Sequence, residues 1–269
     1  MDDPKTLLAV ALHQAPADLV VRGGILANVY TGELLEGWGV AVAGTRIATI
    51  GPEVERCIGP ATTVIDAGGQ IIAPGFIDGH THVESSLLHI AQYARAVVPR
   101  GTTAVVTDLH EIANVCGLEG IRYVLHWANR LPLDVHFMAP SCVPATSPEL
   151  ETAGARLGPE DIRTALRERN AIGLGEMMNF PGVLFADDEV MQKLDAARGR
   201  LVDGHAPRLS GKDLNAYVAA GISSDHETTT FDEGAEKLRR GMHLMVREGS
   251  SEKNLETLLP LITDRTYKR

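Results

Sequence analysis

Two histidines separated by one residue end an apolar run early in the chain. The run covers residues 74–85, and within it His80 and His82 flank a single threonine. Successive side chains of a β-strand point to opposite faces, so both imidazoles project to the same side if the run is a strand. Imidazole nitrogens placed side by side are suited to bind a metal ion. A His-x-His pair alone is weak evidence for such a site, and downstream residues have to support it.

Three later apolar runs also end in side chains that metals prefer. Glu176 is an acid inside one run, and a buried carboxylate needs a cation or a hydrogen-bond partner. His205 and His226 end two further runs. Each residue alone is more often structural than metal-bound, but ligand-type residues at four successive strand ends favour a metal centre. Four imidazoles and a carboxylate able to bridge two ions suit Zn²⁺, Fe²⁺ or Mn²⁺, and the lack of thiolates disfavours a structural zinc site.

Two cations that share a water lower its pKa, supply a hydroxide at neutral pH and polarise the bond under attack, so the predicted chemistry is hydrolysis. Sequence signatures of other chemistries are missing. The chain has no Gly-x-Ser-x-Gly elbow, no P-loop, and no His-x-Glu with Pro-Cys-x-x-Cys of the cytidine-type zinc deaminases.

After Pro74 the chain alternates strands with helices, the pattern of a parallel sheet. The predicted strands are 75–83, 103–108, 134–139, 172–177, 201–205, 221–225 and 243–248. The polar residues fall at the carboxyl ends of these strands, where (β/α)8 TIM barrels place their sites. The predicted fold class is therefore α/β, a TIM barrel. We expect the barrel to be incomplete, because the chain ends where an eighth strand would begin.

Helix start signals separate several of these strands. They are Gly158-Pro159 with Ile162 and Leu166 on one face, Ser210 with a stop at Gly221, and Thr230 with Glu233 in the form of a capping box. A last helix is expected to carry Leu255, Leu258, Leu259 and Ile262 on one stripe, with a kink at Pro260.

The first 73 residues have a different pattern. Residues 1–16 are expected to form a helical or loose leader. Residues 17–73 contain short β-branched runs separated by glycine and proline, which predict a small β-sandwich domain. Residues 74–269 then form the incomplete barrel domain.

Composition limits the partners and the compartment. A formal net charge of −10 without a basic run argues against a nucleic-acid partner. Cys57, Cys116 and Cys142 lie far apart, which indicates reduced thiols in a cytoplasmic protein. The N-terminus does not resemble a secretory signal, and no run reaches the length of a membrane span.

Several motifs together resemble the bacterial adenine deaminases of the amidohydrolase superfamily. The narrowest are His82-Val83-Glu84-Ser85-Ser86, His110-Glu111-Ile112-Ala113-Asn114-Val115 and Arg247-Glu248-Gly249-Ser250. The resemblance extends from Asp18 to about Asp264. It implies a composite β-sandwich beside a distorted TIM barrel, a binuclear Mn²⁺ or Fe²⁺ centre with Zn²⁺ as an alternative, and a homo-oligomer. It also implies hydrolysis of adenine to hypoxanthine and ammonia in purine salvage.

The resemblance implies roles for individual residues. His80 and His82 would hold one metal, Glu176 would bridge, and His205 and His226 would hold the second. The other implied site residues are Asp108 and Glu227 in catalysis, and His110, Glu111 and Ser250 at the substrate. Asp108 as a helix cap, and His110 with Glu111 as a solvated turn, stay open alternatives. An ordinary surface pair is a further open alternative for Arg247 and Glu248, and neither is assigned a role. His89, His126, His136 and His243 are interpreted as structural.

The chain departs from the family pattern in two places. Leu109 stands where the family usually has proline. The family's last barrel strand brings a proton-shuttling aspartate, and no residue here is expected at that place, since Asp264 falls in the predicted last helix.

Two alternatives to adenine deamination remain. One is another amidohydrolase, acting on a cyclic amide or a different aminopurine. Glu176 argues against the usual cyclic-amide branch, which bridges its metals with a modified lysine. The other is a truncated chain that binds metal or associates through its open edge without efficient turnover.

Overall fold

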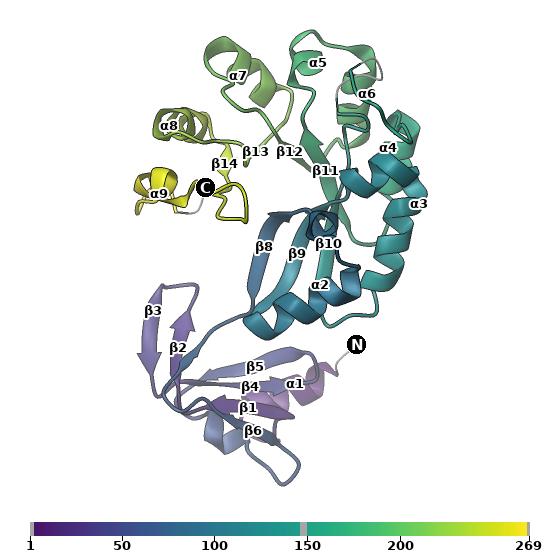
Figure 1. The fold of residues 1–269 in the computed structure, drawn as a ribbon. Coiled ribbons are helices and arrows are strands. Elements are labelled where there is room, and N and C mark those ends of the chain that lie inside the picture. The colour runs from purple at the N-terminus through teal and green to yellow at the C-terminus, as the bar shows by residue number, and fades with distance from the viewer. Residues whose placement is uncertain (1–2, 146–149, 268–269) are drawn as a thin grey trace. The chain divides into compact units, whose positions relative to one another are not determined.

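A computed structural model describes residues 3–145 and 150–267. By its internal contacts the chain divides between Pro74 and Gly75 into two compact units. The first unit contains two small β-sheets, and the second contains a curved parallel sheet with helices along its outer side (Figure 1).

The first unit forms its core from short strands and one helix. Its elements are α1 (Pro4–Ala11), β1 (Leu19–Arg22), β2 (Ile25–Asn28), β3 (Glu33–Glu36), β4 (Gly39–Ala43), β5 (Arg46–Gly51), β6 (Thr63–Asp66) and β7 (Ile71–Ile72). The sheets have the orders β5-β4-β1-β6 and β3-β2-β7. Asp3 caps α1 by accepting from the backbone N–H groups of Lys5 and Thr6. Val10 of this helix is fully buried, so α1 packs into the core of the unit.

The second unit contains the strands that position the candidate site. They are β8 (Phe76–Thr81), β9 (Thr102–Asp108), β10 (Asp134–Ala139), β11 (Ala171–Met177), β12 (Leu201–Gly204), β13 (Ser224–Asp225) and β14 (His243–Leu244). The first five form a parallel sheet in the order β12-β11-β10-β9-β8, and β13 pairs in parallel with β14. The predicted α/β fold is confirmed as a partial parallel barrel.

Helices connect these strands along the outer side of the sheet. Their bounds are α2 (Ile90–Val97), α3 (His110–Ala128), α4 (Pro159–Ala165), α5 (Phe180–Leu184), α6 (Asp188–Ala196), α7 (Gly211–Ala219), α8 (Phe231–Arg239) and α9 (Leu255–Leu258). The predicted starts of α4, α7 and α8 are confirmed, and Ile162 and Leu166 are both buried. None of the helices in the described ranges is long and apolar enough to cross a membrane.

The predicted capping box at Thr230 is half right. Thr230 Oγ1 accepts from the backbone N–H of Glu233 at 3.4 Å. The Glu233 carboxylate does not return to Thr230. Its Oε1 instead accepts from the backbone N–H of Arg208 at 2.8 Å and from Lys237 Nζ at 2.7 Å. The acid that a capping box would use therefore ties α8 to the segment after β12.

The predictions for the C-terminal elements were wrong in detail. Strands β13 and β14 pair over two residues each, shorter than the predicted 221–225 and 243–248. The last helix ends at Leu258, and a 3-10 turn, Leu259–Leu261, follows, because Pro260 has no N–H to continue an α-helix. Leu258 and Leu261 are buried there, in place of the predicted stripe. Asp264 lies beyond this turn and outside any helix.

Candidate metal centre

The five predicted metal ligands converge at the carboxyl edge of the sheet. His80 lies in β8 and His82 directly after it, Glu176 lies near the end of β11, and His205 and His226 follow β12 and β13. Parallel strands bring their carboxyl ends to one edge, so residues distant in sequence meet there.

Glu176 lies between two pairs of histidines and presents one carboxylate oxygen to each pair. Its Oε1 is 3.2 Å from His80 Nε2 and 2.7 Å from His82 Nε2. Its Oε2 is 2.7 Å from His205 Nδ1 and 3.4 Å from His226 Nε2. This division of the two oxygens is the arrangement that a carboxylate bridging two cations requires.

Other groups orient the first pair of histidines. His80 Nδ1 is 3.1 Å from Asp203 Oδ2, and His82 Nδ1 is 3.0 Å from the backbone oxygen of Asp108. Each contact leaves Nε2 of the ring directed at Glu176. Histidines that bind metals commonly use their second nitrogen in this way.

Packing and a tyrosine fix the second pair. The His226 ring stacks on the His80 ring with centroids 3.7 Å apart. The backbone N–H of His205 donates to Tyr217 Oη at 3.0 Å, and that hydroxyl donates to the backbone oxygen of Met177 at 2.8 Å. Tyr217 is fully buried, and these two hydrogen bonds join the strand ends that carry His205 and Glu176.

Asp108 supports Glu176 from strand β9. Its Oδ2 accepts the backbone N–H of Glu176 at 2.9 Å. Residue 175 is glycine because a Cβ there would lie 1.9 Å from that same Oδ2. Asp108 does not cap α3, because the N-cap residue is Leu109, which makes no side-chain cap bond. His110 Nδ1 lies 3.5 Å from Asp108 Oδ1 and 3.9 Å from Glu176 Oε1, so both predicted residues belong to the cluster.

The electrostatics of the cluster favour bound positive charge. Burial raises the pKa of Glu176, but the nearby imidazoles of His205, His226, His80 and His82 outweigh this effect and hold the pKa far below its ordinary value. Burial lowers the pKa of His80, yet Asp203 and Glu176 together raise it to about 10. Burial also lowers the pKa of His110, but the nearby Asp108 carboxylate outweighs this and raises it to about 9.

The donor set fits divalent cations. Within residues 3–145 and 150–267, three groups bring ligand atoms within 4.8 Å of one another. They are His80 with Glu176 and His226, His82 with His110 and Glu176, and His205 with His226 and Glu227. Glu176 Oε1 and Asp108 Oδ1 are buried without a hydrogen-bond partner in the described part of the chain. Imidazole and carboxylate donors suit Mn²⁺, Fe²⁺ and Zn²⁺.

The predicted catalytic Glu227 lies beside the second pair of histidines. Its Oε1 is 3.8 Å from His205 Nδ1 and 3.8 Å from His226 Nε2. Arg247 binds both of its carboxylate oxygens. The open alternative of Arg247 and Glu248 as a surface pair is wrong, because Glu248 Oε2 instead accepts from the backbone N–H of Leu255.

The two remaining predicted residues differ in where they lie. Ser250 lines a cleft of about 600 Å³ whose walls include His80, His82, His226 and Arg247. Glu111 is exposed in the first turn of α3, where its Oε1 accepts from Ser85 Oγ at 2.5 Å, and it does not line that cleft.

Asp203 belongs to the cluster but had no predicted role. It is buried, contacts His80, and accepts from Ser224 Oγ at 2.6 Å. The signal that identified Glu176, an acid inside an apolar strand, is also present at Asp203.

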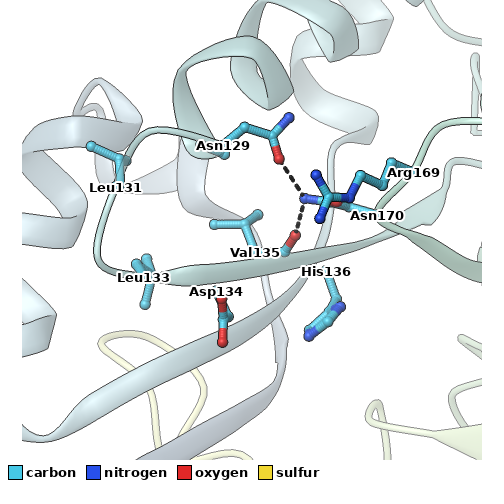
Figure 2. A pocket seen from close by; sticks show the side chains of 9 residues that line it. Asn129, Leu131, Leu133, Asp134, Val135, His136, Arg169 and Asn170 are labelled. Carbon is cyan, nitrogen blue, oxygen red and sulfur yellow. Dashed lines mark hydrogen bonds between the residues drawn. The ribbon is translucent and has the colours of Figure 1, made fainter. Parts of the chain in front are cut away.

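A second pocket, of about 380 Å³, lies at the start of β10 (Figure 2). Figure 2 shows Asn170 bridging Asn129 Oδ1 and the backbone oxygen of Val135 across it, at 3.2 and 2.8 Å. Barrel sites form at the carboxyl ends of the strands, so this pocket is at the wrong edge for the metal centre.

The fold is a βα half-barrel, and two pairs of histidines surround a carboxylate at its carboxyl edge. This combination is typical of metal-binding barrel proteins. The chain belongs to the amidohydrolase family, whose model matches residues 71–262. That match covers most of the second unit and every residue of the cluster.

Among curated proteins the chain resembles adenine deaminases, which confirms the resemblance predicted from the motifs. It is 56% identical over 263 residues to the adenine deaminase of Dehalococcoides mccartyi. It is 49% identical over 265 residues to adenine deaminase 2 of Carboxydothermus hydrogenoformans. Both alignments cover 98% of this chain, which spans 45% of the length of each relative.

Solved structures support the fold. A Xaa-Pro dipeptidase matches 84% of this chain and 66% of its own with a TM-score of 0.58 at 17% identity. Molinate hydrolase matches 88% of this chain and 64% of its own with a TM-score of 0.57 at 16% identity. At this level of identity the likeness establishes the fold alone.

Proposed function

We propose that this chain carries the metal centre of a hydrolase that converts adenine and water to hypoxanthine and ammonia. The observation that carries the proposal is Glu176, whose two carboxylate oxygens face separate pairs of histidines. The similarity to adenine deaminases supports adenine as the substrate.

The cluster has donor atoms for two divalent cations, and we assign the ligands by the resemblance to adenine deaminases, an assignment that the contacts of Glu176 support. His80 and His82 would hold one ion, His205 and His226 would hold the other, and Glu176 would lie between them as the shared ligand. Bound there, the ions would supply hydroxide at neutral pH and polarise the bond under attack. Mn²⁺ or Fe²⁺ is the proposed metal, with Zn²⁺ as the alternative.

Glu227 is the proposed proton carrier. The reaction forms a bond from oxygen to C6 of the purine and breaks the bond from C6 to the amino nitrogen. A proton must leave the attacking water and reach that nitrogen before ammonia departs. The Glu227 carboxylate lies beside His205 and His226 and is held at both oxygens by Arg247, so it is oriented for this transfer.

The remaining predicted residues lie on two sides of the proposed reaction centre. Asp108 and His110 contact Glu176 on the His82 side, which supports a catalytic role for Asp108 and a substrate-side role for His110. Ser250 in the cleft supports a contact to the purine. The exposed position of Glu111 supports only a role at the edge of the site.

Two further parts of the proposal concern the protein in the cell. We propose a cytoplasmic location, which the widely spaced cysteines support. We also propose a homo-oligomer, because sheet edges with unpaired backbone groups favour association. Light scattering of the purified chain tests the assembly.

The test of the function is a substrate panel. The purified chain is loaded with Mn²⁺ or Fe²⁺ under reducing conditions and offered adenine, hydantoin and dihydroorotate. We expect ammonia from adenine at a rate well above that of a His80→Ala control. Turnover of a cyclic amide instead would assign the site to another branch of the family. Absence of turnover with every substrate would contradict an active centre in this chain.

A further inference from the structure

Lys237 is a fully buried cation at the second half of the metal centre. Its side chain lies on α8 and is 0% exposed. Nζ donates to the backbone oxygen of Ala206 at 2.9 Å, to Asp225 Oδ2 at 2.9 Å and to Thr228 Oγ1 at 3.1 Å. A fourth contact, at 2.7 Å, joins it to Glu233 Oε1 on its own helix.

These acceptors come from the two segments that carry the second histidine pair. Ala206 is the residue after His205, and Asp225 is the residue before His226. Thr228 follows in the same segment as His226 and Glu227. One ammonium group therefore joins the end of β12 to the end of β13 through residues adjacent to His205 and His226.

Asp225 extends this junction to the backbone. Its Oδ1 accepts the N–H of Ala206 at 2.9 Å, and its Oδ2 accepts the N–H of Glu227 at 3.1 Å and Thr228 Oγ1 at 2.7 Å. The carboxylate thus fixes the backbone after both His205 and His226. Lys237 supplies the opposite charge that this buried carboxylate needs.

An apolar side chain would fill the same volume, but it could not hold oxygens from two segments at once. Replacement of a buried ion pair by apolar residues is often neutral for stability, so stability alone does not explain a lysine here. What the ammonium adds is a fixed spacing between the segments that present His205 and His226.

We propose that Lys237 is a positioning residue for the second cation subsite, setting the distance between His205 and His226 through the residues adjacent to them. The inference rests on the metal centre assigned above and does not depend on adenine as the substrate. Removing groups that orient metal ligands typically lowers metal affinity by about 10–100-fold.

The experiment compares Mn²⁺ binding to the 269-residue chain and to the Lys237→Met variant, by calorimetric titration and by the electron paramagnetic resonance signal of coupled ions. We expect the His80–His82 subsite to bind as in the unchanged chain. We expect the second subsite to weaken by about 10–100-fold, with loss of the coupled signal. The first subsite serves as an internal control, because general damage to the fold would weaken both.

Lys193→Met is the matched control. Lys193 is also a buried lysine, paired at 3.2 Å with Glu189 on α6, and within the described residues no ion pair joins it to either segment of the second subsite. It should leave both affinities unchanged. If Lys237→Met does not fold, Thr228→Val removes one hydroxyl from the same network at nearly constant volume, and the second subsite should still weaken selectively.

Unchanged binding at both subsites in a folded variant would overturn the proposal, and so would equal weakening of both. A chain that binds two ions but releases no ammonia from adenine would contradict the proposed function and leave the role of Lys237 intact. The two failures are therefore distinguishable.

Discussion

Arg247 donates hydrogen bonds to Glu227 from both terminal nitrogens of its guanidinium. Nη1 is 2.5 Å from Oε1 and Nη2 is 3.3 Å from Oε2, and both side chains are about four-fifths buried, at 21% and 20% exposure. A two-point contact fixes the plane of a carboxylate as well as its position. The proposed proton carrier is therefore held in one orientation beside the second pair of histidines.

Arg247→Met should slow catalysis without removing metal. We expect Glu227→Gln to lower kcat by about 10²–10⁴-fold and Arg247→Met to lower it by at least about tenfold, because a freed Glu227 is less well aimed. The double variant should be no slower than Glu227→Gln alone, since the arginine acts through that carboxylate. Steady-state ammonia release measures this.

The control for Arg247→Met is Arg198→Met, which removes an exposed arginine paired with Asp195. It should leave kcat unchanged. Full additivity of the Arg247 and Glu227 effects would show that the arginine acts independently of the carboxylate.

Glu176→Gln should disrupt the pairing of the two cations. An amide keeps the volume but offers a single neutral oxygen, so it cannot serve both histidine pairs as a carboxylate does. We expect the metal content measured by mass spectrometry to fall from two ions per chain to one or fewer. Glu160→Gln changes an exposed acid on α4 and should keep both ions. A Glu176→Gln chain with full metal content would exclude a bridging role.

Tyr217→Phe should destabilise the second unit. The hydroxyl is buried between the N–H of His205 and the backbone oxygen of Met177, and its removal leaves both groups without a partner. The free energy of unfolding should fall by about 1–3 kcal/mol in urea titrations. Tyr123→Phe, at an exposed tyrosine, should change it little. Equal effects of the two substitutions would contradict the assigned contacts.

Thiol reactivity should separate Cys116 from the other two cysteines. Cys116 is exposed, whereas burial raises the pKa of the Cys57 and Cys142 thiols and keeps both in the neutral form. Since the thiolate is the reactive form, raising the pH to about 8.5 should still label only Cys116 in the native chain. Denaturant should expose all three, and Cys116→Ser should abolish native labelling. Rapid labelling of all three thiols in the native chain would contradict the burial of Cys57 and Cys142.

The sequence predicted which residues form the site better than it predicted the side-chain contacts that those residues make. His80, His82 and Glu176 were recognisable because strand periodicity and the cost of a buried charge are local properties. Arg247 was assigned no role, because its partner Glu227 lies 20 residues away and meets it only in the folded chain. Asp203 carries the same local signal as Glu176, an acid inside an apolar strand, but its contact to His80 joins residues 123 positions apart and is not a local property.

The same limit applies to the fold. Strands β8 to β12 follow from apolar runs with turn residues between them, and their parallel pairing follows from the intervening helices. The bounds of helix α3 were not predicted, since Gly117 and Gly120 interrupt its pattern and Gly117 has a φ of 59° inside it. The stripe predicted beyond Asn254 failed because Pro260 tightens the chain into a 3-10 turn and changes which leucines point inward.

The most direct test of the central claim is anomalous X-ray diffraction from crystals of the chain grown with Mn²⁺. We expect two manganese peaks on opposite sides of the Glu176 carboxylate, about 3.5–4 Å apart as in other two-metal sites. One peak should lie against His80 and His82 and the other against His205 and His226. A single peak, or peaks away from Glu176, would contradict a binuclear centre bridged by this residue.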